Sequence, residues 1–161
     1  MKNFKSFLIN CGTIILSILT IVFLSQGYVK WTALGRDYYT SGFKYIDFSS
    51  TDTRRDMTAF ANVFVLILAM LLIIFAFVSL LKDCGAVKMS KKANKVIACF
   101  EAILAVITLI FTTVALGCLA SIVGELGATW GLGWAVIANL IVSVLILVLS
   151  FMSVVNANKR K

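Results

Sequence analysis

The stretch TAFANVFVLILAMLLIIFAFVSLL, residues 58–81, decides the fold class. It contains no charged residue, and its only polar side chains are Thr58, Asn62 and Ser79. A helix of a soluble protein needs a polar face, which this stretch lacks. A helix crosses the roughly 30 Å hydrocarbon core of a bilayer with about 20 apolar residues. Residues 58–81 therefore predict a transmembrane helix.

Three further apolar stretches have the same character, at residues 7–24, 96–123 and 134–155. The whole chain is 61% hydrophobic and only 14% charged, whereas about a quarter of an ordinary soluble domain is charged. The first stretch exceeds the usual apolar core of a signal peptide and no small-residue cleavage site follows it, so we interpret it as a retained anchor. We predict a single integral membrane domain over residues 1–161: an all-α bundle of four transmembrane helices.

Lysine and arginine in the short connections predict the orientation of these helices. The connection 82–95 holds five lysines, and further basic residues flank both ends of the chain. Such excesses mark the cytoplasmic side. We therefore expect a cytoplasmic loop at 82–95, outer loops at 25–57 and 124–133, and both termini in the cytoplasm, most simply in the plasma membrane.

The net charge of +8 follows from the same residues. Because the basic side chains flank apolar stretches, we interpret them as topology signals and contacts to anionic lipid, and not as a nucleic-acid site. The expected headgroup contacts are Lys88, Lys91, Lys92 and Lys95.

The outer loop 25–57 holds every tyrosine of the chain. Residues 28–32 and 43–48 alternate as strands do, and Gly35 and Gly42 supply turn signals. We expect a small β-hairpin cap here, with an irregular aromatic loop at the membrane interface as the alternative. The expected partner-binding side chains of this cap are Trp31, Tyr38, Tyr39 and Tyr45. In the second outer loop we interpret Trp130 and Trp134 as interfacial anchors.

Polar residues within the apolar stretches recur at helical spacings of three and four, which places them on one face of each helix. Polar groups in lipid are expensive and usually face the bundle interior. We expect Asn10 and Glu101 to share a depth, and Asn62 and Asn139 to contact each other directly or through water. The full stripe is Asn10, Thr13, Asn62, Glu101, Thr108, Thr112 and Asn139.

Two functions are compatible with this stripe. The first is structural: the polar groups hold the helices together, at about 1 kcal/mol per contact, in a protein that binds another membrane protein or itself. Lys95 would then neutralise Glu101. The second is a small proton, ion or solute channel or transporter subunit that uses Glu101 as its binding site. A membrane immunity or protection protein would use the same surfaces as the first.

Enzymatic chemistry is not indicated. The chain has no histidine and its four cysteines form no CxxC pair, so we expect no metal and no cofactor. No nucleophile lies beside a base in a recognisable motif, and we expect no catalytic residue. Cys84 is interpreted as a free thiol, with lipidation as the alternative.

Local signals mark the ends of the 58–81 helix. Thr53 with Asp56 forms a capping box before it, and Gly85 is a plausible stop after it.

The overall layout resembles the claudin-like tetraspan group in helix number and loop lengths. That family's G-L-W motif followed by two cysteines is absent from residues 25–57, and the string 131–134 lies in the other outer loop. The resemblance therefore transfers no functional residue.

Overall fold

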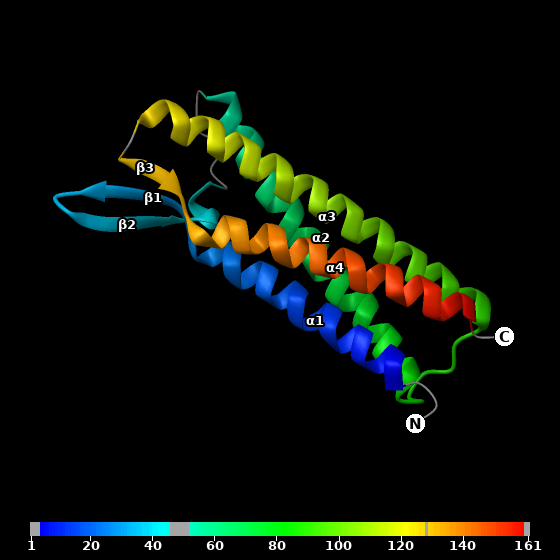
Figure 1. Cartoon of the computed structure of the whole chain (residues 1–161). Coiled ribbons are helices and arrows are strands. Elements are labelled where there is room, and N and C mark those ends of the chain that lie inside the picture. The colour runs from blue at the N-terminus through cyan, green and yellow to red at the C-terminus, as the bar shows by residue number, and fades with distance from the viewer. Residues whose placement is uncertain (1–3, 46–51, 128, 160–161) are drawn as a thin grey trace.

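A computed structural model of the chain describes residues 4–45, 52–127 and 129–159. Four helices account for most of it, and all four are long and apolar enough to cross a membrane. They lie side by side in one elongated bundle, with both termini at one end (Figure 1). We call this the terminal end, and the opposite end the sheet end. The helices are α1 (Phe4–Ser25), α2 (Thr53–Asp83), α3 (Lys91–Leu126) and α4 (Trp134–Lys159).

The main helix contacts join α1 to α2, α2 to α3, α3 to α4 and α4 to α1, so that α1 and α3 lie on a diagonal. Small side chains fill many of the buried positions, which lets helix backbones approach closely. The middle of the bundle is a buried apolar cluster of Leu72, Ala105, Val142 and Ile146. Large apolar side chains are exposed along all four helices.

The helices extend beyond the apolar stretches, because capping and not hydropathy sets their ends. Asp52 is the N-cap of α2, with its side chain accepting from the Arg54 N–H at 2.9 Å, so the predicted cap at Thr53 was wrong by one residue. Ser90 caps α3 in the same way. Gly85 follows the end of α2 with a φ of 81°. Its N–H donates to the Lys82 carbonyl, so the predicted stop is confirmed.

A three-stranded antiparallel sheet projects from the sheet end (Figure 1). Its strands are β1 (Gly27–Ala33), β2 (Arg36–Ser41) and β3 (Trp130–Leu132), in the order β2-β1-β3. Leu34 and Gly35 form the two-residue turn of the hairpin, with φ values of 51° and 71°. Positive φ at both positions matches the right-handed twist of the strands.

The β cap predicted for residues 25–57 is therefore present, but its second strand was misplaced. That strand is β2, whereas residues 43–45 of the predicted strand belong to a 3-10 helix, η1 (Gly42–Tyr45). Residues 46–48 lie outside the described residues. The third strand was not predicted at all, since residues 130–132 were interpreted only as part of a turn.

Backbone hydrogen bonds join β1 to the two residues that flank β3, and buried side chains join the sheet to the bundle. The Gly133 N–H donates to the Tyr28 carbonyl at 2.8 Å, and the Thr32 N–H donates to the Thr129 carbonyl at 2.8 Å. Tyr28 and Val29 are each 1% exposed and belong to a buried cluster with residues of all four helices. The sheet is thus a continuation of the bundle core and not a separate loop.

Candidate functional site

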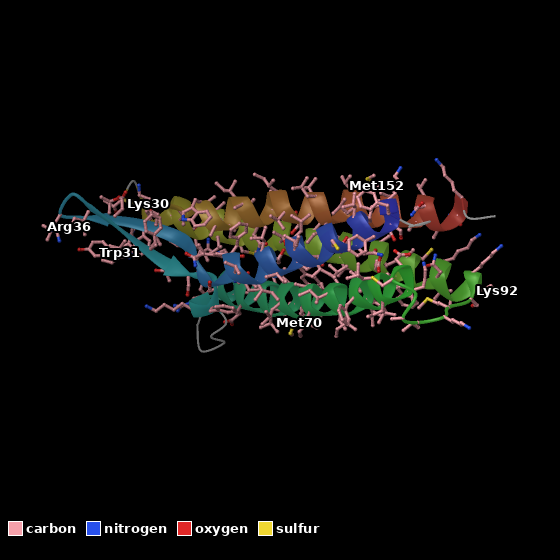
Figure 2. All side chains as sticks on the ribbon, turned by 90° about the horizontal axis from the view of Figure 1, so that it is seen from below. Lys30, Trp31, Arg36, Met70, Lys92 and Met152 are labelled. Atoms are coloured by element: carbon pink, nitrogen blue, oxygen red, sulfur yellow. The ribbon has the colours of Figure 1, made fainter. Side chains whose placement is uncertain are left out.

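One face of the sheet carries a row of stacked aromatic rings, the aromatic face. Trp31 of β1 lies opposite Tyr38 of β2 and Trp130 of β3, so the three side chains share one face. The ring centroids of Trp31 and Tyr38 are 4.4 Å apart, and those of Trp31 and Trp130 are 6.0 Å apart. Figure 2 shows Trp31 on the projecting sheet, well away from Lys92 at the terminal end. The row forms an apolar strip that runs from β2 across β1 to β3.

The opposite face of the sheet is polar. Lys30 pairs with Asp37 at 2.8 Å, and the Thr32 hydroxyl donates to the same carboxylate at 2.8 Å. The hydrogen bond from Lys30 keeps the pKa of Asp37 below its ordinary value. Tyr39 lies on this face opposite Lys30 and covers Gly27. The predicted partner-binding set is therefore divided: Trp31 and Tyr38 lie on one face and Tyr39 on the other.

The side chain of Tyr45, the fourth member of the predicted set, lies outside the described part of the structure. Trp130 takes its place beside Trp31, and sequence reasoning had assigned it only to membrane anchoring. Trp134 is 53% exposed at the start of α4 and packs edge-to-face on Phe23 of α1. The two tryptophans therefore have different surroundings: Trp130 belongs to the sheet and Trp134 to the helices.

A cleft of about 360 Å³ lies between the sheet and the helix ends beside Trp130. Thr40 and Trp130 line its sheet side, and Ile122 and Leu126 of α3 line its helix side. Its remaining described walls carry both charge signs, from Lys44, Asp52 and Arg55. The apolar strip is therefore bordered by a partly charged recess.

Two buried asparagines connect the helices to the sheet and to η1. The Asn139 side chain of α4 donates to the Tyr28 hydroxyl at 2.7 Å, and the Asn62 side chain of α2 donates to the Gly42 carbonyl at 3.2 Å. Neither side-chain oxygen has a hydrogen-bond partner among the described residues. The predicted direct hydrogen bond between the two asparagines is thus not formed, because each amide group binds the sheet or η1 instead. Burial raises the pKa of Tyr28 to about 12.

A second polar group, the terminal-end cluster, lies between the helices near the termini. The Asn10 side chain of α1 donates to the Asp83 carboxylate at 3.0 Å, and the Ser79 hydroxyl donates to Glu101 at 3.1 Å. Ser153 of α4 lies within hydrogen-bonding reach of Glu101. Asn10 and Glu101 are therefore linked through α2, since Ser79 and Asp83 are one turn apart on it.

The cation of this cluster is Lys82 and not Lys95. Lys82 pairs with Asp83 at 3.5 Å and donates to the Asn94 side chain, and it also acts electrostatically on Glu101. Lys95 is exposed. We predicted residues 82 and 83 to lie in a loop, but α2 continues through both of them. The Asp83 side chain is fully buried. The spacing of Asp83 from Ser79 could have predicted that both belong to this cluster, because residues four apart share a helix face.

The threonines of the predicted stripe mostly bond their own helices. Thr13 donates to the Ile9 carbonyl at 3.1 Å and Thr108 to the Leu104 carbonyl at 2.8 Å. Thr112 also shares a hydrogen bond of 3.1 Å with Ser143 of α4. All three threonines are buried. Of these hydroxyls, only that of Thr112 joins two helices.

The predicted headgroup lysines are exposed at the terminal end, as Figure 2 shows for Lys92. Lys88 lies in the connection between α2 and α3, whereas Lys91, Lys92 and Lys95 lie in the first turns of α3. Cations are unfavourable at a helix N-terminus, so these lysines do not serve the stability of α3.

No three His, Cys, Asp or Glu side chains of the described residues are grouped to hold a metal ion. Comparisons of the chain with protein-family models, curated proteins and solved structures found no match. The geometry therefore offers two candidate features: the aromatic face at the sheet end and the terminal-end cluster inside the bundle.

Proposed function

We propose that this chain is an integral membrane protein that binds a protein partner through the aromatic face of its sheet. Membrane insertion is supported by the four long apolar helices and by the large apolar side chains exposed along each of them. A monomeric soluble protein rarely exposes apolar patches larger than a few hundred Å². Lipid is the solvent that makes such a surface stable.

The proposed orientation puts the sheet outside the cell and the termini in the cytoplasm. It rests on the lysine-rich connection between α2 and α3, which lies at the same end as both termini. Cys84 in this connection is exposed and can be labelled after the other three cysteines are replaced by Ser. In a second variant, all four cysteines are replaced and Leu34 at the hairpin tip becomes Cys.

In intact cells, an impermeant thiol reagent should label the Leu34→Cys variant and leave Cys84 unlabelled until the membrane is opened. Labelling of both sites from one side would refute the four-span topology. Release of the chain by alkaline carbonate would refute insertion itself.

One observation carries the partner-binding proposal: the stacked row Tyr38, Trp31 and Trp130 on a sheet that projects beyond the helices. Aromatic residues, above all Trp and Tyr, dominate the centres of protein interfaces. Stacking and the contacts at Tyr28 hold the rings in place before binding, which lowers the entropy lost on association. The partner would be another membrane protein or a second copy of this chain.

Tyr38 and Tyr39 provide a matched pair for testing this, because they are adjacent and lie on opposite faces. A photo-cross-linking amino acid at position 38 should capture one defined partner in native membranes, and the same group at position 39 should not. Replacing Trp31 and Tyr38 with Ala should abolish co-purification of that partner, while Tyr39→Ala retains it. Equal capture from both positions, or retention by the double variant, would exclude the aromatic face.

Transport through the terminal-end cluster is the second candidate function. The observation in its favour is the burial of two carboxylates, Asp83 and Glu101, beside one lysine. Against it, the polar groups of the cluster pair with neighbouring helices, as interhelical hydrogen bonds do in a static bundle. A buried apolar cluster also occupies the middle of the bundle. We therefore favour a structural role for Glu101, and a flux measurement described below separates the two.

A further inference from the structure

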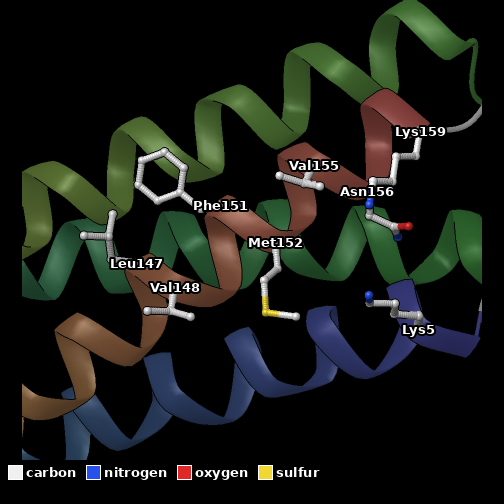
Figure 3. A pocket seen from close by; sticks show the side chains of 8 residues that line it. All are labelled: Lys5, Leu147, Val148, Phe151, Met152, Val155, Asn156 and Lys159. Carbon is white, nitrogen blue, oxygen red and sulfur yellow. The ribbon is translucent and has the colours of Figure 1, made fainter.

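A shallow apolar groove of about 380 Å³ runs along α4 at the terminal end. Two rows of side chains four residues apart line it, and Figure 3 shows them on the surface of α4. The first row is Leu147, Phe151 and Val155, and the second is Val148 and Met152. Val148, Phe151 and Val155 are each about half exposed. The groove has the volume of an ordinary small-molecule site, roughly 300–1,000 Å³.

Cations stand at one end of this groove. Lys5 of α1 and Lys159 of α4 line it together with Asn156, which faces Lys5 across the seam between the two helices (Figure 3). Neither lysine forms an ion pair or a hydrogen bond within the described part of the chain. Among the residues that the structure describes, no acid lines the groove. The lining is thus apolar along its length and positively charged at its terminal end.

The dimensions match one leaflet of a bilayer. From Leu147 to Lys159 the groove extends about 18 Å along α4, at 1.5 Å per residue. Half of the hydrocarbon core is about 15 Å deep. If the chain spans a membrane as proposed above, the lysines therefore lie at the headgroup level.

We infer that this groove binds one anionic phospholipid. Its phosphate contacts Lys5, Lys159 and the Asn156 amide, and one acyl chain lies against Val148 and Met152. The inference rests on the proposed membrane insertion but not on partner binding at the sheet. It differs from the general attraction of lysines to anionic lipid, since here an apolar track ends at cations from two different helices.

Charge decides the class of occupant. A second copy of this chain carries the same basic residues at this end, so two copies packed groove to groove would place like charges together. A zwitterionic lipid leaves both cations without a net countercharge. An anionic lipid satisfies the cations and the apolar track at once.

The test is native mass spectrometry of the purified chain in detergent, with phosphatidylglycerol, phosphatidylcholine or inorganic phosphate added. Phosphatidylglycerol should be retained more strongly than phosphatidylcholine, by about fivefold for each lysine. Inorganic phosphate should not compete at equal concentration, because it lacks the acyl chain. The Lys5→Gln/Lys159→Gln variant should bind the two lipids equally.

Two control variants make the result specific. Lys88→Gln/Lys92→Gln removes the same charge from the same end, so it measures the general attraction of lysines to anionic lipid, and it should reduce the preference for phosphatidylglycerol less than the Lys5→Gln/Lys159→Gln variant does. Val148→Trp fills the groove while both cations remain, and should lower retention of this lipid severalfold. Ile141→Trp, at an exposed position two turns earlier on α4, should not.

Three results would overturn the inference: an equal loss in the Lys88/Lys92 variant, full retention in the Lys5/Lys159 variant, or displacement of the lipid by phosphate alone. A dimer that Val148→Trp dissociates would assign the groove to a second copy instead. Carbonate extraction separates this failure from that of the proposed topology. A chain that stays in the membrane without lipid preference refutes the groove site alone, and a chain that is extracted refutes insertion.

Discussion

The Asn139 side chain in α4 donates a hydrogen bond of 2.7 Å to the Tyr28 hydroxyl in β1, across 111 positions of sequence. Both residues are almost fully buried, at 0% and 1% exposure. The contact ties the sheet to the last helix and thereby sets the position of the aromatic face.

Tyr28→Phe should lower the free energy of unfolding by about 1–3 kcal/mol, because it leaves a buried amide N–H without its acceptor. Denaturant unfolding in detergent, followed by tryptophan fluorescence, measures this loss. Tyr39→Phe is the control, since Tyr39 is half exposed and its hydroxyl is not part of this contact. It should change stability by less than about 0.5 kcal/mol. Equal effects of the two variants would show that the Tyr28 hydroxyl does not anchor the sheet.

The sheet should also weaken at high pH. Burial raises the pKa of Tyr28 from 10.0 to about 12, so the folded state keeps the proton that the unfolded state loses. The resulting stabilisation is complete below pH 10 and is lost as the pH rises from 10 towards 12. Tyrosinate absorbance should show a late ionisation step near pH 12. In the Tyr28→Phe variant this late step should be missing; its persistence would assign the step to another residue.

Any side chain at Gly133, at the junction between β3 and α4, should destabilise the protein. A Cβ atom there would lie 1.9 Å from the Gly27 carbonyl oxygen, so Gly133→Ala must displace backbone. We expect a loss of about 1–3 kcal/mol, typical of overpacking, measured by the thermal midpoint in detergent. Gly131→Ala, with open space at its Cβ position, should be nearly neutral. A neutral Gly133→Ala would contradict the close approach of the two segments.

Glu101 should matter for stability and not for transport. Glu101→Ala removes the acceptor of the Ser79 hydroxyl and should cost about 1–3 kcal/mol. Glu101→Gln keeps an acceptor oxygen and should cost less. Proteoliposomes of the wild type and of Glu101→Gln should both show no proton or cation flux. Wild-type flux that Glu101→Gln abolishes in a pH-dependent way would establish transport in place of the structural role.

The sequence alone determined the four helices, because hydrophobic length is a local property of the chain. Each predicted stretch lies within an observed helix, and the Gly85 stop was readable from local backbone preference. Helix ends were less accurate, as at Asp83, because a helix does not end where its apolar residues end. The hairpin of β1 and β2 was partly readable from alternation and from Gly35.

Tertiary structure decided which polar group meets which. Spacing placed Asn10, Asn139 and Glu101 on buried faces, but their partners Asp83, Tyr28 and Ser79 come from other elements. Residues 130–132 carry no strand signal of their own and become β3 only because β1 offers an unpaired edge. A buried polar group takes the nearest partner that the packed backbone presents, and that geometry arises only when distant segments come together.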